Sequence, residues 1–278
     1  MDQPPRSDRK RSRGPALAAL VAVAVAVLAA LVWTQMREPP PPPAPEVASA
    51  PVAEPKPPAE PEVRHPIEAV PVEPIPRAEP LPPRDQSDGA LIEAVSALVG
   101  PGSLERWFFA DALVRRFVVT VDNLPRETLP MQVRIARATP GSFLTAGGES
   151  APAIHSENAR RYEPFVAFVE AIDARKLVAI YVSFYPLLQE EYRAIGFPHG
   201  QFNDRVVQAI DDMLAAPELD GPIALVQPKV MYRFADPELE SLSSGRKIMV
   251  RAGTDNARRL KAKLREIRRL LAGAAQSR

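Results

Sequence analysis

The stretch that decides the fold is KLVAIYVSFYPLLQEEYRAIG, residues 176–196, because its part from Leu177 to Leu188 is apolar on nearly every side of a helix. A helix of that kind buries its whole surface, so we expect it at the centre of a helical domain. Tyr185 precedes Pro186, and a proline removes an amide donor and crowds the preceding turn, so we expect a break or a kink there. Gly196 is a typical helix stop. The predicted fold class is therefore mainly α.

Apolar residues at helical spacing, preceded by capping residues, predict further helices on both sides of this centre. The stretches concerned are 90–100, 104–121, 157–172, 201–217, 235–242, 243–253 and the chain from about residue 255. Residues 122–153 are rich in turn signals and are expected to hold at most one short strand, near 142–145. The segments 223–228 and 229–234 are rich in β-branched and aromatic residues, so they predict a small β-hairpin.

A second apolar run, ALAALVAVAVAVLAALVW at residues 16–33, has 18 consecutive residues without a charge. As a helix it would span about 27 Å, close to the hydrocarbon thickness of a bilayer. Five basic residues precede it, whereas Arg37 and Glu38 follow it, so the positive-inside rule leaves the N-terminus in the cytoplasm. The rival interpretation is a cleaved signal peptide, but LVWTQM at the end of the run is a poor cleavage site. We therefore expect an uncleaved, single-pass membrane helix.

Small residues recur at every fourth position of this run, a spacing that lets membrane helices approach closely. They are Ala18, Ala22, Ala26 and Ala30. The stripe is compatible with a homodimer through the membrane helix. An alternation of Ala and Val also produces such a stripe by itself, so the two interpretations stay open.

Residues 34–86 are expected to be a disordered, Pro-rich linker. Of the 33 prolines in the chain, 18 fall between Pro39 and Pro83, and the residues between them show no apolar period. An extended segment of this length reaches at most on the order of 140 Å. It is either a spacer or a tract that a groove-bearing partner recognises. The predicted organisation is an N-terminus (1–15), a membrane helix (16–33), this linker and a helical domain (87–272).

Several long motifs of the domain resemble one bacterial family. They are VDNLPR, NARRYEPFV, FYPLLQEEYRAIGFP, QFNDRVVQAIDDMLAAP, YRFADPELESL and KIMVRAGTDNARRLKAKL. Together they are similar to the domain of unknown function 3014 family over nearly all of residues 84–271. The resemblance implies a proteobacterial protein anchored in the cell inner membrane, with its C-terminal domain in the periplasm. It implies no activity and no catalytic or binding residue.

The composition excludes several kinds of chemistry. The formal net charge is +1, so a generic nucleic-acid binder is not expected, and the absence of cysteine excludes thiol nucleophiles and disulfides. Ser244–Lys247 spell S-x-x-K and Ser156–Asn158 spell S-x-N, but their order is reversed relative to the penicillin-recognising enzymes and no K-T-G follows. His155 and His199 have no partner at metal-ligand spacing. We expect no catalytic residue, no metal and no cofactor.

Two groups of residues are candidates for binding. An anionic ligand or a pocket among the helices would use Arg160, Arg161, Tyr162 and Arg233, with Tyr185 and Tyr192 nearby. Pairing of Arg160 and Arg161 with Asp122 or Asp236 would explain these arginines equally well. The second group is a basic face on the last helix, formed by Arg258, Arg259, Lys261, Lys263, Arg265, Arg268 and Arg269. By default such a face is solvated, and its functional alternatives are a wall polymer, an acidic partner, anionic lipid or the acidic linker.

The function expected from this architecture is that of a tethered binding or scaffold module of the cell envelope. A long linker is natural for a domain that must reach a fixed layer, such as an envelope protein or a wall component. The alternative is a periplasmic enzyme or small-ligand sensor with a pocket among the helices.

Overall fold

The structure, a computed structural model, describes residues 62–76, 80–148 and 150–273. The predicted membrane helix and the first part of the linker lie outside these ranges. In the part of the chain that is described, no helix combines the length and the apolar character needed to cross a membrane.

The central helix of the domain is α6 (Ala174–Ala194), as the sequence predicts. The Asp173 carboxylate caps it by accepting the amide of Lys176 at 3.0 Å. Val178, Phe184 and most other apolar side chains of this helix are buried, and α2, α4, α7 and α10 pack against it. The helix runs through Pro186 without ending, so the expected break is absent. Packing of α6 against other helices on several sides offsets the loss of the one backbone hydrogen bond that proline cannot donate.

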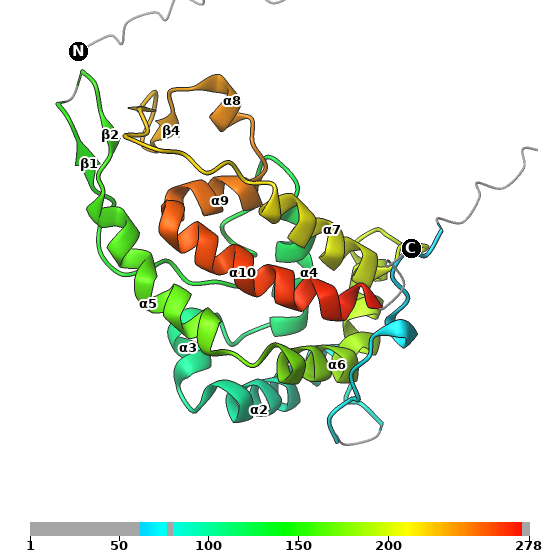
Figure 1. Cartoon of the computed structure of the whole chain (residues 1–278). Coiled ribbons are helices and arrows are strands. Elements are labelled where there is room, and N and C mark those ends of the chain that lie inside the picture. Colours follow the sequence, from blue (N-terminus) through cyan, green and yellow to red (C-terminus); the bar gives the residue numbers. More distant parts are fainter. Residues whose placement is uncertain (1–61, 77–79, 149, 274–278) are drawn as a thin grey trace, which may run out of the picture. The chain divides into compact units, whose positions relative to one another are not determined.

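The remaining helices confirm a mainly helical domain (Figure 1). They are η1 (Ile67–Ala69), η2 (Arg84–Gln86), α2 (Asp88–Val99), α3 (Ser103–Trp107), α4 (Leu113–Asn123), α5 (Glu157–Ala171), α7 (Phe202–Leu214), α8 (Pro237–Glu240), α9 (Ser244–Ala252) and α10 (Thr254–Leu271). The apolar stripe predicted for α7 is present, since Phe202, Val206 and Ile210 are all buried in the main core.

The single helix predicted over 104–121 is wrong, because the chain forms α3 and α4 with a break between them. Ala112 ends the break with a left-handed φ of 49°. The Asp88 carboxylate accepts the amides of Ala112 and Leu113 at 2.7 and 2.8 Å and so caps α4 from another helix. A continuous apolar pattern cannot reveal a helix start that a distant side chain fixes.

Four two-residue strands lie side by side. They are β1 (Thr145–Ala146), β2 (Ala153–Ile154), β3 (Leu225–Val226) and β4 (Arg233–Phe234). The antiparallel pair β3–β4 confirms the predicted hairpin, and β1 lies at the edge of the strand expected near 142–145. β2 was not predicted; it pairs with β1 and also bonds the chain before β3, where the Ile154 amide donates to the Ile223 carbonyl at 2.9 Å.

Residues 62–76, which we call the strap, belong to the segment expected to be linker, yet they pack on the helical domain (Figure 1). Val70 is 8 % exposed, and Ile67 and Val72 contact the main core. Gly273 lies so close to the strap that an added Cβ would stand 2.9 Å from the Ala69 carbonyl oxygen. The packed part of the chain therefore begins before α2.

Hydrogen bonds to the backbone hold the strap in place. The Asp204 carboxylate on α7 accepts the amides of Arg64 and His65 at 3.1 and 2.6 Å. The Ser183 hydroxyl on α6 accepts the Ile75 amide at 2.8 Å. Such bonds fix an extended segment that has no regular structure of its own.

The strap and the strands lie at opposite ends of the helical part of the molecule. In Figure 1 the strap runs beside the C-terminal end of α10, while both hairpins lie beyond the other end of that helix. We call these regions the strap end and the hairpin end.

Candidate functional site

The structure places the four residues named for binding in separate surroundings. Arg160 pairs with Glu157 of its own helix at 3.0 Å. Arg161 donates to the carbonyls of Pro140 and Gly141 at 3.1 and 2.7 Å, and so holds the loop before β1. Tyr162 is half-buried on α5, whereas Arg233 is exposed on β4. No ion pair or hydrogen bond between described residues joins Arg233 to the other three.

Asp122 and Asp236, the carboxylates considered as partners for these arginines, have other roles. Asp236 caps α8 by accepting the Glu238 amide at 2.8 Å. Asp122 is 5 % exposed and binds Arg126 at 2.7 Å and Arg205 at 3.0 Å. A buried carboxylate between two guanidinium groups ties the end of α4 to α7. The sequence does not reveal this cluster, because Arg205 lies 83 residues after Asp122 in the chain and each of the three residues suits a surface position.

The tyrosines proposed to line a pocket belong to the core. Tyr185 is 8 % exposed, and its hydroxyl donates to Gln189 Oε1 at 2.8 Å. Burial raises the pKa of Tyr185 to about 12 and raises the pKa of Tyr181 well above its ordinary value. Tyr192 packs against Phe197 with ring centroids 4.6 Å apart. These rings stabilise the fold around α6 and are not free to hold a ligand.

Most of the predicted basic face on α10 is neutralised within the domain. The contacts are Arg258 with Glu218 and Asp255, Arg259 with Glu170, Lys261 with Glu218, Lys263 with Glu266, and Arg268 with Asp211. Lys261 is only 4 % exposed and also donates to the Ala216 carbonyl at 2.7 Å. The hydrogen bond from Arg259 lowers the pKa of Glu170, and hydrogen bonds from Arg258 and Lys261 lower that of Glu218.

Arg265 and Arg269 are the two members of this face for which no ion pair with a described residue is present, and both are exposed. Two arginines, one helical turn apart, are too few to form the concentrated positive field that a polyanion requires. The other five residues of the face connect α10 to α5, to α7 and to the chain after α7.

The S-x-x-K stretch is the first turn of α9 and has a structural role. Its amides at Ser244 and Gly245 donate to the carbonyls of Arg126 and Leu124 at 2.6 and 2.8 Å. A Cβ on Gly245 would stand 2.8 Å from Met213 Cγ, so only glycine fits this contact. In the S-x-N stretch, Asn158 is fully buried and binds the backbone of the loop before β1.

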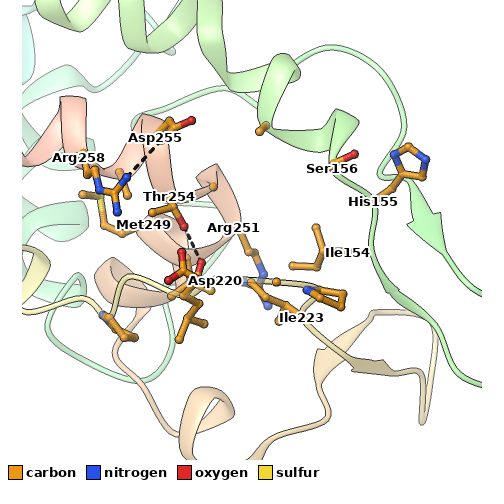
Figure 2. Close-up of a pocket in the computed structure, with 18 of the residues that line it drawn as sticks. Ile154, His155, Ser156, Asp220, Ile223, Met249, Arg251, Thr254, Asp255 and Arg258 are labelled. Carbon is orange, nitrogen blue, oxygen red and sulfur yellow. Dashed lines mark hydrogen bonds and ion pairs between the residues drawn. The ribbon is translucent and has the colours of Figure 1, made fainter.

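A cleft with a volume of about 630 Å³ opens at the hairpin end (Figure 2). Its walls are the end of β2 with the start of α5, the chain 217–223, and the corner between α9 and α10. The floor is apolar and includes Ile154, Ile223 and Met249, of which Met249 is fully buried. No single segment supplies the cleft, which explains why sequence patterns did not reveal it.

Charged groups of both signs surround this floor. Arg258 pairs with Glu218 at 2.9 Å and with Asp255 at 3.5 Å. The Arg251 guanidinium lies over the ring of Phe234, 4.8 Å from its centroid, and has no ion pair with a described residue. Asp220 also lines the cleft. An apolar floor with both kinds of charge at its rim suits an amphipathic ligand such as a short extended peptide.

Two polar side chains of the cleft bond to the backbone. Thr254 donates its hydroxyl to the Leu219 carbonyl at 2.7 Å, and His155 accepts the Glu157 amide with its Nδ1 at 3.1 Å. Among the described residues, no hydrogen bond joins Ser156 or Thr254 to a base. Nor does any group of three or more metal-binding side chains occur in the ranges that the structure describes.

The comparisons with known proteins agree with the motifs quoted above. The family model described as "Protein of unknown function (DUF3014)" matches residues 113–268, which contain α4 to α9, most of α10 and both hairpins. This match confirms the family resemblance. No curated protein and no solved structure matches the chain.

Proposed function

Because the chain belongs to the DUF3014 family, whose description gives no activity, we propose a function from the sequence pattern and the geometry of the described domain: a tethered binding module of the cell envelope. Residues 16–33 anchor the chain in the inner membrane with the N-terminus in the cytoplasm. The helical domain stands in the periplasm at the end of the linker and binds an envelope protein or a wall component. Pairing of membrane helices provides a homodimer.

The observation that carries this proposal is the separation of the strap from the cleft. The linker joins the domain through the strap, whose backbone is bonded to α6 and α7. The cleft and the exposed hairpins lie at the opposite end of the described part (Figure 1). A tether attached at one end leaves the other end free to meet a partner. A strap docked beside the cleft would instead have obstructed it.

A photo-crosslinking experiment in native membranes tests the proposal. A photoreactive amino acid replaces Asp255, whose side chain is 95 % exposed at the rim of the cleft, in the full chain. The matched control replaces Glu68, an exposed acidic residue in the strap. We expect a discrete adduct with an envelope component from position 255 and none from position 68. Adducts from position 68 alone, or from neither position, would contradict the proposal.

The cleft also supports a second candidate, a small-ligand sensor. Its volume of about 630 Å³ falls within the range of small-molecule sites. A thermal-shift screen of peptides and amphipathic metabolites on the full chain tests this candidate. Ile223 and Leu239 are both half-buried in one apolar cluster, but only Ile223 lines the cleft. A stabilising compound whose effect disappears in Ile223→Gln, but persists in Leu239→Gln, would favour the sensor over the binding module.

A further inference from the structure

The tip of the β3–β4 hairpin exposes a cluster of apolar side chains. Val230 is 85 % exposed, Met231 72 % and Val226 45 %. Seven large apolar side chains are exposed in the described ranges, and three of them fall within these six residues, 226–231. Scattered exposed apolar residues need no explanation, but a cluster at a projecting tip indicates a contact surface.

The exposure is imposed by the fold. Leu225 faces Phe234 across the hairpin, and both are buried against Val250. Because side chains alternate along a strand, the next pair, Val226 and Arg233, must face outward. The hairpin is therefore fixed on the domain by one face and presents the other face to its surroundings.

The charged residues within this hairpin are basic, although acidic residues border it at Asp220 and Asp236. Between Gly221 and Ala235 the sequence has no acidic residue, whereas Lys229 and Arg233 are both present. Neither cation has an ion pair with any residue that the structure describes. The basic face of α10 differs in this respect, because Glu170, Asp211 and Glu218 neutralise most of it. The tip thus combines exposed apolar side chains with two cations that have no ion pair in the described part of the chain.

We propose that the hairpin tip docks on an anionic lipid surface. Val230 and Met231 enter the boundary between headgroups and acyl chains, while Lys229 and Arg233 stay at the level of the lipid phosphates. A tip whose two cations have no ion pair with a described residue fits a phosphate layer better than a hydrophobic groove of a protein, because a groove would bury the two cations. This inference rests on the proposed function, in which the hairpin end is the free end of the tethered domain.

Three apolar side chains and two cations give weak binding by themselves. A tether raises the effective concentration of the tip at a surface within its reach to the millimolar range, so weak contacts suffice. Docking would hold the domain in one orientation on the membrane.

The test uses the full chain reconstituted in lipid vesicles. The chain has no cysteine, so Met231→Cys allows one environment-sensitive dye to be placed at the tip. Met131→Cys is the matched control, because Met131 is 58 % exposed but its neighbouring cations are held against the fold: Arg134 is half-buried, and Arg137 donates to the Phe108 carbonyl at 2.9 Å. The vesicles contain either phosphatidylcholine alone or a mixture with phosphatidylglycerol. The readouts are the emission wavelength and quenching by a nitroxide on the lipid chain.

We expect the dye at position 231 to shift to shorter wavelength and to be quenched only with phosphatidylglycerol, while the dye at position 131 stays in water. Lys229→Glu with Arg233→Glu should lower the inserted fraction roughly tenfold or more. A dye at 231 that stays in water, or equal signals from both positions, overturns the proposal. A signal in native membranes but not in protein-free vesicles also overturns it; the partner is then a protein, and the tethered binding module stands.

Discussion

The strap end of the domain buries polar groups together with their hydrogen-bond partners, whereas the hairpin end exposes apolar side chains and cations to solvent. At the strap end, Asn203 is fully buried, and its amide group binds the carbonyls of His65 and Leu271 and the hydroxyl of Tyr181. At the hairpin end, Val230 is 85 % exposed, and Lys229 has no ion pair with a described residue.

This difference separates two roles. Buried polar groups with partners fix one arrangement of the chain, so the strap end holds the protein's own tether. Exposed apolar groups and unpaired cations contribute little to folding, so the hairpin end remains available for binding. Substitutions that remove polar contacts at the strap end should therefore lower the free energy of unfolding more than substitutions at the exposed hairpin tip.

The largest effect is expected from Asn203→Ala. It leaves the buried His65 and Leu271 carbonyls and the Tyr181 hydroxyl without their partner, which should lower the free energy of unfolding by about 3 kcal/mol. Denaturant unfolding of the full chain measures this. Asn123→Ala, which removes one bond to the Val119 carbonyl, is the control and should cost less. Equal effects of the two variants would mean that the Asn203 network contributes no more to stability than the single hydrogen bond of Asn123.

A smaller effect is expected from Asp204→Ala, which removes the acceptor for the Arg64 and His65 amides. The free energy of unfolding should fall by about 1–2 kcal/mol, and hydrogen exchange in the strap should accelerate. The control on the same helix is Asp211→Ala, which breaks the partly exposed pair with Arg268 and should leave strap exchange unchanged. Strap exchange that is already fast in the unmodified chain would show that the strap is not docked.

High pH should also weaken the strap end. Burial raises the pKa of Tyr185 to about 12, compared with about 10 in an unfolded chain. The folded state therefore holds the phenolic proton more tightly, so this contribution to stability is complete below pH 10 and is lost as the pH rises through 12. Unfolding by urea between pH 8 and 12 measures the loss. In Tyr185→Phe the decline over that window should be shallower; an identical decline would contradict the assignment.

The smallest effect is expected from the combined change Val230→Ser and Met231→Ser at the hairpin tip. Both side chains are largely exposed, so the free energy of unfolding should stay within about 0.5 kcal/mol of the original value. Leu225→Ser, on the buried face of the same hairpin, is the destabilising counterpart. A large loss from the tip variant would mean that these residues serve the fold and not a partner.

Much of the helical fold was predictable, because apolar spacing in 176–196 and in α7 reports burial directly. The strap was not predictable, because proline-rich composition has no period and the contacts that fix it come from Asp204, 139 residues after His65 in the chain. The break before α4 has the same origin, since Asp88 caps that helix from 25 residues away. Local patterns identify elements, whereas distant polar contacts decide where irregular segments lie.

The candidate site was less predictable than the fold. The basic pattern of α10 was visible, but pairing of Arg259 with Glu170 and of Arg268 with Asp211 depends on helices that meet only after folding. The cleft draws on four separate segments and has no sequence signature. The hairpin itself was predicted from its composition, but the outward face of Val226 and Arg233 follows from a register that only the structure gives.

Hydrogen exchange on the full chain, compared between native membranes and detergent solution, tests the central claim most directly. If the hairpin end is the binding end, amides in 224–234 should gain protection in native membranes, while those in the strap, residues 62–76, should exchange at the same rate in both. Added protection confined to the strap, or none at either end, would contradict the account.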